Sequence, residues 1–286
     1  MRIFLVLAML VFSLQAKSLF SNKDQEEASK YINALKDLMI ATQKTRGKTN
    51  AYLNGDRSAL LLIQGTKRDM KRAIGEMEAL PLAENPTIGE KATTISQALT
   101  ELNSKALRSK NPKAVFDAYT EQIDQILMLA QTVSKQGSKD LNPLGKEATR
   151  IMMETILPLT EATGRLRGMG SGIIARGKIT ETQKFAILSL LNEMDDLETR
   201  LQSEMKNIMS KHRDMYKAST SKYLTKLHKQ VKTYVNLTNA KILGAKVDTS
   251  YSSSKFFDKG TEIISTLMVI FDANRKAIVK DSQGWI

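Results

Sequence analysis

The sequence predicts an all-α protein, made of two long four-helix bundles in tandem. Leu, Ala, Lys, Glu, Thr and Met dominate the 286 residues, whereas there are only five prolines and eight phenylalanines, a composition typical of helices. Apolar residues recur at helical spacing through about eight segments. These segments are about 25 residues long and are joined by short loops, as long four-helix bundles require.

The first half of the chain holds four expected helices. Gly55 ends the first of them and Pro81 ends the second. The loop QGSKDLNPLG at 136–145 is rich in Gly, Pro and polar residues, and we take it as the boundary between a first bundle, 17–138, and a second bundle, 139–286. The four helices are expected over residues 23–54, 57–80, 87–107 and 112–135.

Four more helices are expected in the second half. Gly177 ends the fifth helix, Pro158 is expected to kink it, and the Thr180 hydroxyl caps the start of the sixth. The sixth and seventh helices are expected to be nearly continuous through KHRD, near residue 213. A single continuous helical rod is the alternative architecture. The expected ranges are 146–176, 181–243 for the sixth and seventh helices together, and 255–280.

The N-terminal stretch MRIFLVLAMLVFSLQAKS predicts a secretory signal peptide over residues 1–16. One basic residue precedes an apolar run from Ile3 to Leu14, and cleavage is expected after the small residue Ala16. A retained membrane anchor is the alternative, but the run is much shorter than the about 20 apolar residues of a spanning helix. We therefore expect an exported protein, located in the periplasm or elsewhere outside the cytoplasm.

Charge and cysteine content narrow the classes of partner and chemistry. The formal net charge is +13 and the isoelectric point is about 9.7, which favours anionic partners, although a solvated lysine surface explains the charge equally well. No nucleic-acid-binding signature is present, so nucleic acid is not expected as a partner. The chain has no cysteine, which excludes disulfides, thiol catalysis and Cys-ligated zinc.

Two segments of the chain align without gaps at an offset of 121 residues. They are TQKTRGKTNAYLNG at 42–55 and TGRLRGMGSGIIAR at 163–176. Each lies near the end of the first helix of its half, which favours a duplicated bundle. The matched pairs are Thr42 with Thr163, Arg46 with Arg167, Gly47 with Gly168 and Leu53 with Ile174.

Each copy places an arginine on the apolar stripe of its helix. Arg46 lies on the heptad line of Ile32 and Met39, and Arg167 lies on that of Met153. A guanidinium stays charged when buried and therefore needs a partner. No carboxylate lies within one turn of Arg46 on its own helix.

Two kinds of partner remain open for these arginines. A carboxylate from a neighbouring helix, such as Asp195 or Glu76, would form an internal ion pair. Glu161, six residues before Arg167 on the same helix, is expected to point away from it. A small planar anion from outside the chain would instead be clamped by two guanidinium groups.

Three glycines accompany Arg167 at spacings of four residues, namely Gly164, Gly168 and Gly172. Each costs roughly 1 kcal/mol of helix propensity relative to alanine. Either another helix packs closely over this strip, which we favour, or the strip exposes backbone to a ligand.

The segments QKTRGKTNAYLNG and GRLRGMGSGIIARGKIT, the latter at 164–180, resemble the nitrate- and nitrite-sensing (NIT) domain family. The resemblance implies two four-helix bundles side by side that bind nitrate or nitrite through arginines and pass a signal to an output domain. No output domain is recognisable in this chain, so a separate signalling protein is the expected partner. The candidate ligand-binding residues are Arg46, Arg167 and Arg165, with Gln43, Asn50, Thr42 and Thr163 around them.

Catalysis finds no support in the sequence. His212 and His228 are isolated, and EMDDLE at 193–198 lacks the histidine that a carboxylate metal site would need, so neither a metal nor a cofactor is expected. Two hypotheses follow: an exported sensor for a small oxyanion, with a homodimer allowed for, or a ligand-free helical interaction or scaffold protein of the cell envelope.

Overall fold

The computed structural model describes the backbone of residues 2–282 and the side chains of residues 23–281. All regular structure in this part of the chain is helical, which confirms the predicted all-α class. The predicted signal peptide, residues 1–16, lies outside the described side chains. The main helices are α1 (Arg2–Leu53), α2 (Ala59–Glu78), α3 (Pro86–Lys105), α4 (Pro112–Gly137), α5 (Pro143–Ile151), α6 (Leu157–Arg176), α7 (Glu181–Lys211), α8 (Ser219–Lys241) and α9 (Ser253–Ser282).

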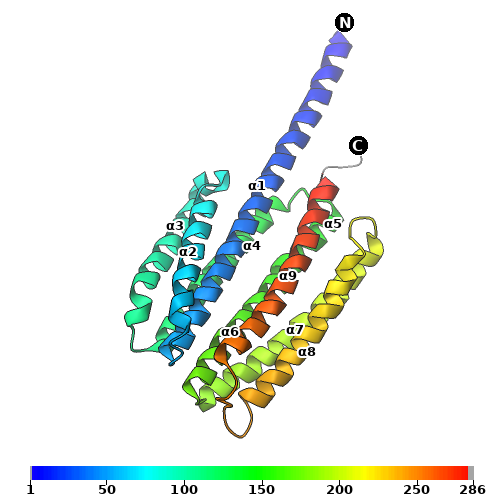
Figure 1. Cartoon of the computed structure of the whole chain (residues 1–286). Helices are drawn as coiled ribbons and strands as arrows, with labels where there is room; N and C mark the ends of the chain where they lie inside the picture. The colour runs from blue at the N-terminus through cyan, green and yellow to red at the C-terminus, as the bar shows by residue number, and fades with distance from the viewer. Residues whose placement is uncertain (1, 283–286) are drawn as a thin grey trace.

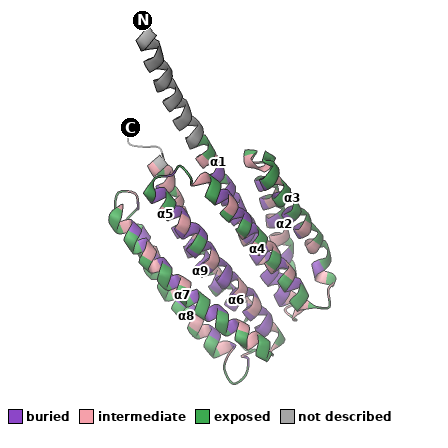
Figure 2. Cartoon of the chain, turned by 180° about the vertical axis from the view of Figure 1, so that it is seen from behind, coloured by how far each residue is buried: buried purple, intermediate pink, exposed green. Residues whose placement is uncertain are grey.

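The helices form two bundles that lie side by side (Figure 1). Helices α1 to α4 make the first bundle, and α5 to α9 make the second, in which α5 and α6 act as one long helix. The bundles meet mainly where α1 packs against α6. Buried residues concentrate on α6 and on the described part of α1, as Figure 2 shows.

Local sequence accounts for the helix starts. Asn-Pro begins three helices, because proline at the first helical position has no N–H to leave unpaired and the preceding asparagine can cap. The Asn85 side chain accepts hydrogen bonds from the N–H groups of Thr87 and Ile88. The predicted Thr180 cap is confirmed, and Gln183 completes a capping box with it.

A short π-helical turn, η3 (Met152–Ile156), joins α5 to α6. Pro158 lies two residues after this turn and has no N–H to donate to the carbonyl one turn back. A wider turn at this point accommodates both the missing hydrogen bond and the steric clash of the proline ring. Thr155 Oγ1 and Arg150 Nη1 donate to the two carboxylate oxygens of Glu204 on α7, at 2.8 and 2.7 Å. These bonds fix the π turn against the rest of the second bundle.

The expected near-continuity of the sixth and seventh helices is wrong. The chain turns between α7 and α8, at His212–Ala218. Contacts with α9 hold this turn, because Tyr216 donates to Asn274 Oδ1 at 3.0 Å and Lys280 donates to the Asp214 carbonyl at 2.8 Å. No glycine or proline marks the turn in the sequence.

Helix α1 packs closely over the glycine strip of α6, which confirms the packing interpretation of that strip. A Cβ atom added at Gly168 would lie 3.2 Å from Gly47 Cα and 2.9 Å from Phe116 Cε2. One added at Gly47 would lie 2.5 Å from Phe257 Cε2. The two glycines of the Arg-Gly repeat therefore face each other at the contact between the bundles.

Alanine at Gly168 is expected to lower the free energy of unfolding by about 1–3 kcal/mol, because the added methyl group overpacks this contact. Gly75, on the exposed face of α2, is the control: a Cβ there meets nothing within 4 Å, so alanine should raise stability by roughly 0.5–1 kcal/mol. Urea denaturation of both variants measures the difference. A Gly168→Ala chain as stable as the native one would contradict the close contact.

Candidate anion-binding site

The two arginines of the repeat are fully buried. Arg46 on α1 and Arg167 on α6 each have 0% of their surface exposed. Helices α1 and α6 are the inner helices of the two bundles, so both side chains lie near the contact between the bundles. The sequence-based placement of both arginines on a buried stripe is confirmed.

The same pair of residue types holds each guanidinium. Arg46 Cζ lies 4.8 Å from the ring centre of Phe116, and its Nη1 donates to Thr120 Oγ1 at 2.9 Å. Arg167 Cζ lies 4.3 Å from the ring centre of Phe257, and its Nη1 donates to Thr261 Oγ1, also at 2.9 Å. Ring and hydroxyl come from α4 in one half and from α9 in the other.

We call these two arrangements the first cradle (Arg46, Phe116, Thr120) and the second cradle (Arg167, Phe257, Thr261). The sequence analysis did not predict the phenylalanine rings or the threonine hydroxyls of the two cradles. A signal was present, because FDAYT at 116–120 and FDKGT at 257–261 share the pattern FDxxT. A phenylalanine and a threonine four residues apart lie on one face of a helix, which is how each helix presents both to a guanidinium.

The first cradle has an internal countercharge. Glu161 on α6, which is 5% exposed, accepts from Arg46 Nη1 at 2.6 Å and from Nη2 at 3.3 Å. Gln43 donates to the same carboxylate at 2.7 Å, and Arg165 Nε donates to it at 3.2 Å. The Arg46 charge is therefore neutralised within the chain.

The expected carboxylate partners of the arginines need correction. Neither Asp195 nor Glu76 reaches a buried arginine, because both are on exposed helix faces. Glu161 does not bind Arg167 on its own helix, as expected, but it crosses the bundle contact and binds Arg46 instead. The way α6 crosses α1 determines this pairing.

The second cradle has no such countercharge among the described residues. Two of the donors of Arg167, Nε and Nη2, have no hydrogen-bond partner, and no carboxylate forms a salt bridge with it. Burial lowers the pKa of Arg167 to about 10, so the group still carries its charge at neutral pH. Glu161 and Asp258 act on this charge only at longer range, so no described carboxylate contacts the buried guanidinium.

A third unpaired donor lies beside Arg167. The hydroxyl of Tyr234, on α8, is buried and has no partner. Gly260 lies between the two side chains: a Cβ at that position would be 2.9 Å from Arg167 Cβ and 3.0 Å from the Tyr234 oxygen. Three hydrogen-bond donors without acceptors are therefore gathered in one buried region.

Lys48 adds a second cation to this region. Its ammonium nitrogen lies 3.9 Å from the ring centre of Phe257, and only 9% of its surface is exposed. Burial lowers the pKa of Lys48, and the Arg167 charge lowers it further, whereas Asp258 and Asp56 oppose the shift. The equivalent position in the repeat is Met169, so the first cradle has no counterpart of this lysine.

The other predicted ligand residues have partners within the chain. The Thr42 and Thr163 hydroxyls donate to carbonyls of their own helices, at Leu38 and Leu159. Asn50 donates to the Gly168 carbonyl at 2.9 Å.

These three residues, Thr42, Thr163 and Asn50, thus support the helices and their contact. Arg165, whose side chain is 34% exposed, contacts Asp124 at 3.5 Å in addition to its bond with Glu161. Arg46, Gln43 and Arg165 are the predicted residues that the structure brings together, around Glu161.

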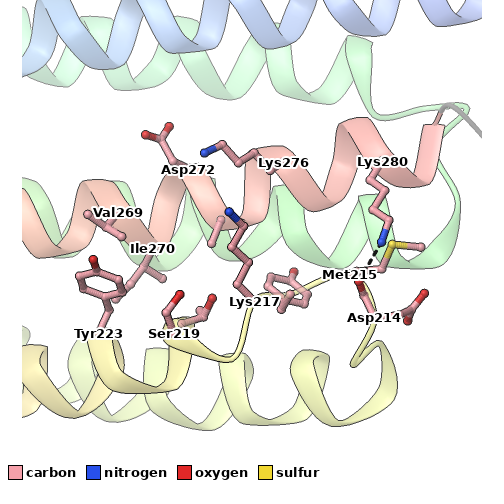
Figure 3. A pocket seen from close by; sticks show the side chains of 13 residues that line it. Asp214, Met215, Lys217, Ser219, Tyr223, Val269, Ile270, Asp272, Lys276 and Lys280 are labelled. Carbon is pink, nitrogen blue, oxygen red and sulfur yellow. Dashed lines mark hydrogen bonds between the residues drawn. The ribbon is translucent and has the colours of Figure 1, made fainter.

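A cavity outside this region lies between the α7–α8 turn and α9. It measures about 460 Å³, and Figure 3 shows Lys217, Lys276 and Lys280 around it together with Asp214 and Asp272. Its lysines are accompanied by carboxylates and neither cradle lines it. It is therefore not the site that the buried arginines form.

No other chemical centre stands out in the described part of the chain. Its histidines, carboxylates and other ligating groups form no cluster that could hold a metal ion, and His228 is a surface residue 3.2 Å from Glu198. No helix within the described residues combines the length and the apolar character that crossing a bilayer requires.

The chain was compared with known proteins. The family model described as nitrate and nitrite sensing matches residues 37–273, which spans both bundles and both cradles. A solved structure, described as that of the NasR transcription antiterminator, superposes with a TM-score of 0.62 at 10% identity, over 96% of this chain and 74% of the other. At this identity the likeness shows the fold alone. No curated protein sequence matches the chain significantly. Because the family model covers most of the sequence, the chain belongs to the nitrate- and nitrite-sensing (NIT) family.

Proposed function

We propose that the protein is an exported sensor module that binds one small planar oxyanion, of the nitrate or nitrite class, at Arg167, and that it signals through a separate protein. The observation that carries this proposal is the asymmetry between the cradles. A buried ion whose partner is missing costs several kcal/mol. Arg46 avoids this cost through Glu161, and an anion from outside the chain would do the same for Arg167.

The geometry of the unpaired donors indicates the class of anion. Nε and Nη2 of Arg167 form one edge of the planar guanidinium, the edge that binds two oxygens of a planar oxyanion side by side. The Tyr234 hydroxyl is a further donor for a third oxygen. Nitrate, nitrite and formate are planar and can lie flat in the plane of the guanidinium, whereas sulfate is tetrahedral and cannot.

Entry of the anion requires a local rearrangement. A hollow of about 10 Å³, lined by Lys48, Ser171 and Phe257 among others, lies beside the second cradle. This volume suits about one water molecule. A bound oxyanion must therefore displace a side chain such as Phe257 or Lys48, and such a displacement at the contact between the bundles is a means of signalling.

A thermal unfolding panel tests the proposal. Nitrate and nitrite are expected to raise the melting temperature in a saturable way, because they bind the folded state preferentially, whereas chloride and sulfate at matched ionic strength give only general salt effects. Arg167→Met should lose the response. Arg72→Met, which removes an exposed arginine of α2, should retain it. Equal shifts with all four anions would refute the proposal.

The response to nitrate should depend little on pH near neutrality. Binding requires the protonated guanidinium, and the pKa of Arg167 is lowered only to about 10, so the shift should be the same at about pH 6 and pH 8 and weaken toward pH 10. A histidine ligand would instead lose its charge between about pH 6 and 8. The nitrate-induced shift in melting temperature, measured across this pH range, distinguishes an arginine ligand from a histidine ligand. A decrease of that shift near pH 6.5 would contradict the assignment to Arg167.

The second candidate function is a ligand-free helical interaction protein of the cell envelope. Its support comes from apolar side chains exposed near the starts of α2 and α7, where Leu61 is 85% and Phe185 is 71% exposed. Such residues suit contact with another protein, either a separate signalling partner or a second copy of the chain. Under this alternative, the anion panel shows no specific shift.

A further inference from the structure

Glu161 occupies the first cradle in the way that a small oxyanion would. Its two carboxylate oxygens accept from the two terminal nitrogens of Arg46, at 2.6 and 3.3 Å. Gln43 and Arg165 donate to the same oxygens, so the carboxylate is held from several sides. A planar carboxylate on a guanidinium is the arrangement that a free planar anion adopts.

The repeat shows where a matching carboxylate would lie in the other half. Glu161 precedes Arg167 by six residues on α6, and it serves Arg46 on α1. By the offset of 121 residues, the corresponding position on α1 is residue 40, which precedes Arg46 by six residues and is an isoleucine. The two cradles therefore differ in one acidic residue: Glu161 neutralises the first cradle, and the second cradle has an isoleucine at the matching position.

We propose that Glu161 is an intramolecular ligand that occupies one of two oxyanion sites related by the repeat, so that the native chain has a single open site. The inference rests on the proposed function for the second cradle. For the first cradle, the inference depends only on the observed contacts of Glu161. It predicts that the first cradle becomes a binding site for small carboxylates and planar oxyanions once the Glu161 side chain is removed.

The test is chemical rescue of Glu161→Ala. Alanine removes the same heavy atoms that acetate supplies, and it leaves the Arg46 charge buried with Phe116 and Thr120 around it. In chloride the variant should melt at a lower temperature than the native chain, and acetate, formate or nitrate should restore the loss in a saturable way. Glu90→Ala, an exposed position on α3, should change neither the melting temperature nor the acetate response.

Two further variants locate the rescue. Glu161→Gln keeps the side-chain volume and should show little or no rescue, because the amide still occupies the cradle. Glu161→Ala combined with Arg46→Met should lose the acetate response, because the guanidinium is gone. A response that survives Arg46→Met, or that is absent in Glu161→Ala, overturns the inference. If Glu161→Ala does not fold in chloride, it should fold in acetate, and failure to fold in both overturns the inference as well.

Calorimetric titration with nitrate separates this inference from the proposed function. If both hold, the native chain binds one anion and Glu161→Ala binds two. If the proposed function fails and the inference holds, the native chain binds none and Glu161→Ala binds one, in a manner that depends on Arg46. One anion bound by both chains, and lost with Arg167→Met in each, supports the proposed function and overturns the inference.

Discussion

Replacing Arg46 by methionine is expected to lower the free energy of unfolding by about 3 kcal/mol, near the lower end of what breaking a buried ion pair costs. The change leaves the buried Glu161 carboxylate without its closest partner. Arg165 and Gln43 still donate to it, which keeps the loss from being larger. Urea denaturation at neutral pH measures the effect.

The double variant Arg46→Met, Glu161→Met is the control for this result. It removes both charges and fills the space with apolar side chains, so much of the stability should return. A single Arg46→Met chain within about 1 kcal/mol of the native one would mean that the pair contributes no more than a surface salt bridge.

Replacing Arg167 by methionine should change the free energy of unfolding in the opposite direction to Arg46→Met. In chloride the variant is expected to be as stable as the native chain or more stable by about 1–2 kcal/mol, because an unpaired buried charge has been removed. In nitrate the order should reverse. At a concentration of 100 Kd, the native chain gains about 2.7 kcal/mol and the variant gains nothing.

Denaturation of the native chain and Arg167→Met in chloride and in nitrate measures this reversal. Arg72→Met, an exposed arginine that contacts Asp69, serves as control and should stay within about 0.5 kcal/mol of the native chain in both salts. A loss of several kcal/mol for Arg167→Met in chloride would show that the guanidinium already has an adequate partner within the chain.

Much of the fold could be predicted from local sequence. Helical periodicity indicated the all-α class, and the cap at Thr180 and the stop at Gly177 lie where their residue types predict them. The turn between α7 and α8 could not be predicted in this way. It depends on contacts such as that of Tyr216 with Asn274, which are 58 residues apart in the chain.

The candidate site, too, was predictable only where it depends on local sequence. Heptad position alone shows that Arg46 and Arg167 are buried. Which of them is neutralised depends on how α6 crosses α1, because Glu161 on one helix reaches the arginine of the other. Periodicity along a single helix carries no information about that crossing. The FDxxT repeat was visible in the sequence, but its meaning depends on the neighbours of α4 and α9.

The central claim is that the Arg167 charge receives its countercharge from a small anion. Isothermal titration of the native chain with nitrate, in a chloride buffer of constant ionic strength, tests this claim most directly. We expect saturable binding of one nitrate per chain, which Arg167→Met abolishes and Arg72→Met leaves unchanged. No saturable heat with the native chain, or the same binding curve with Arg167→Met, would contradict it.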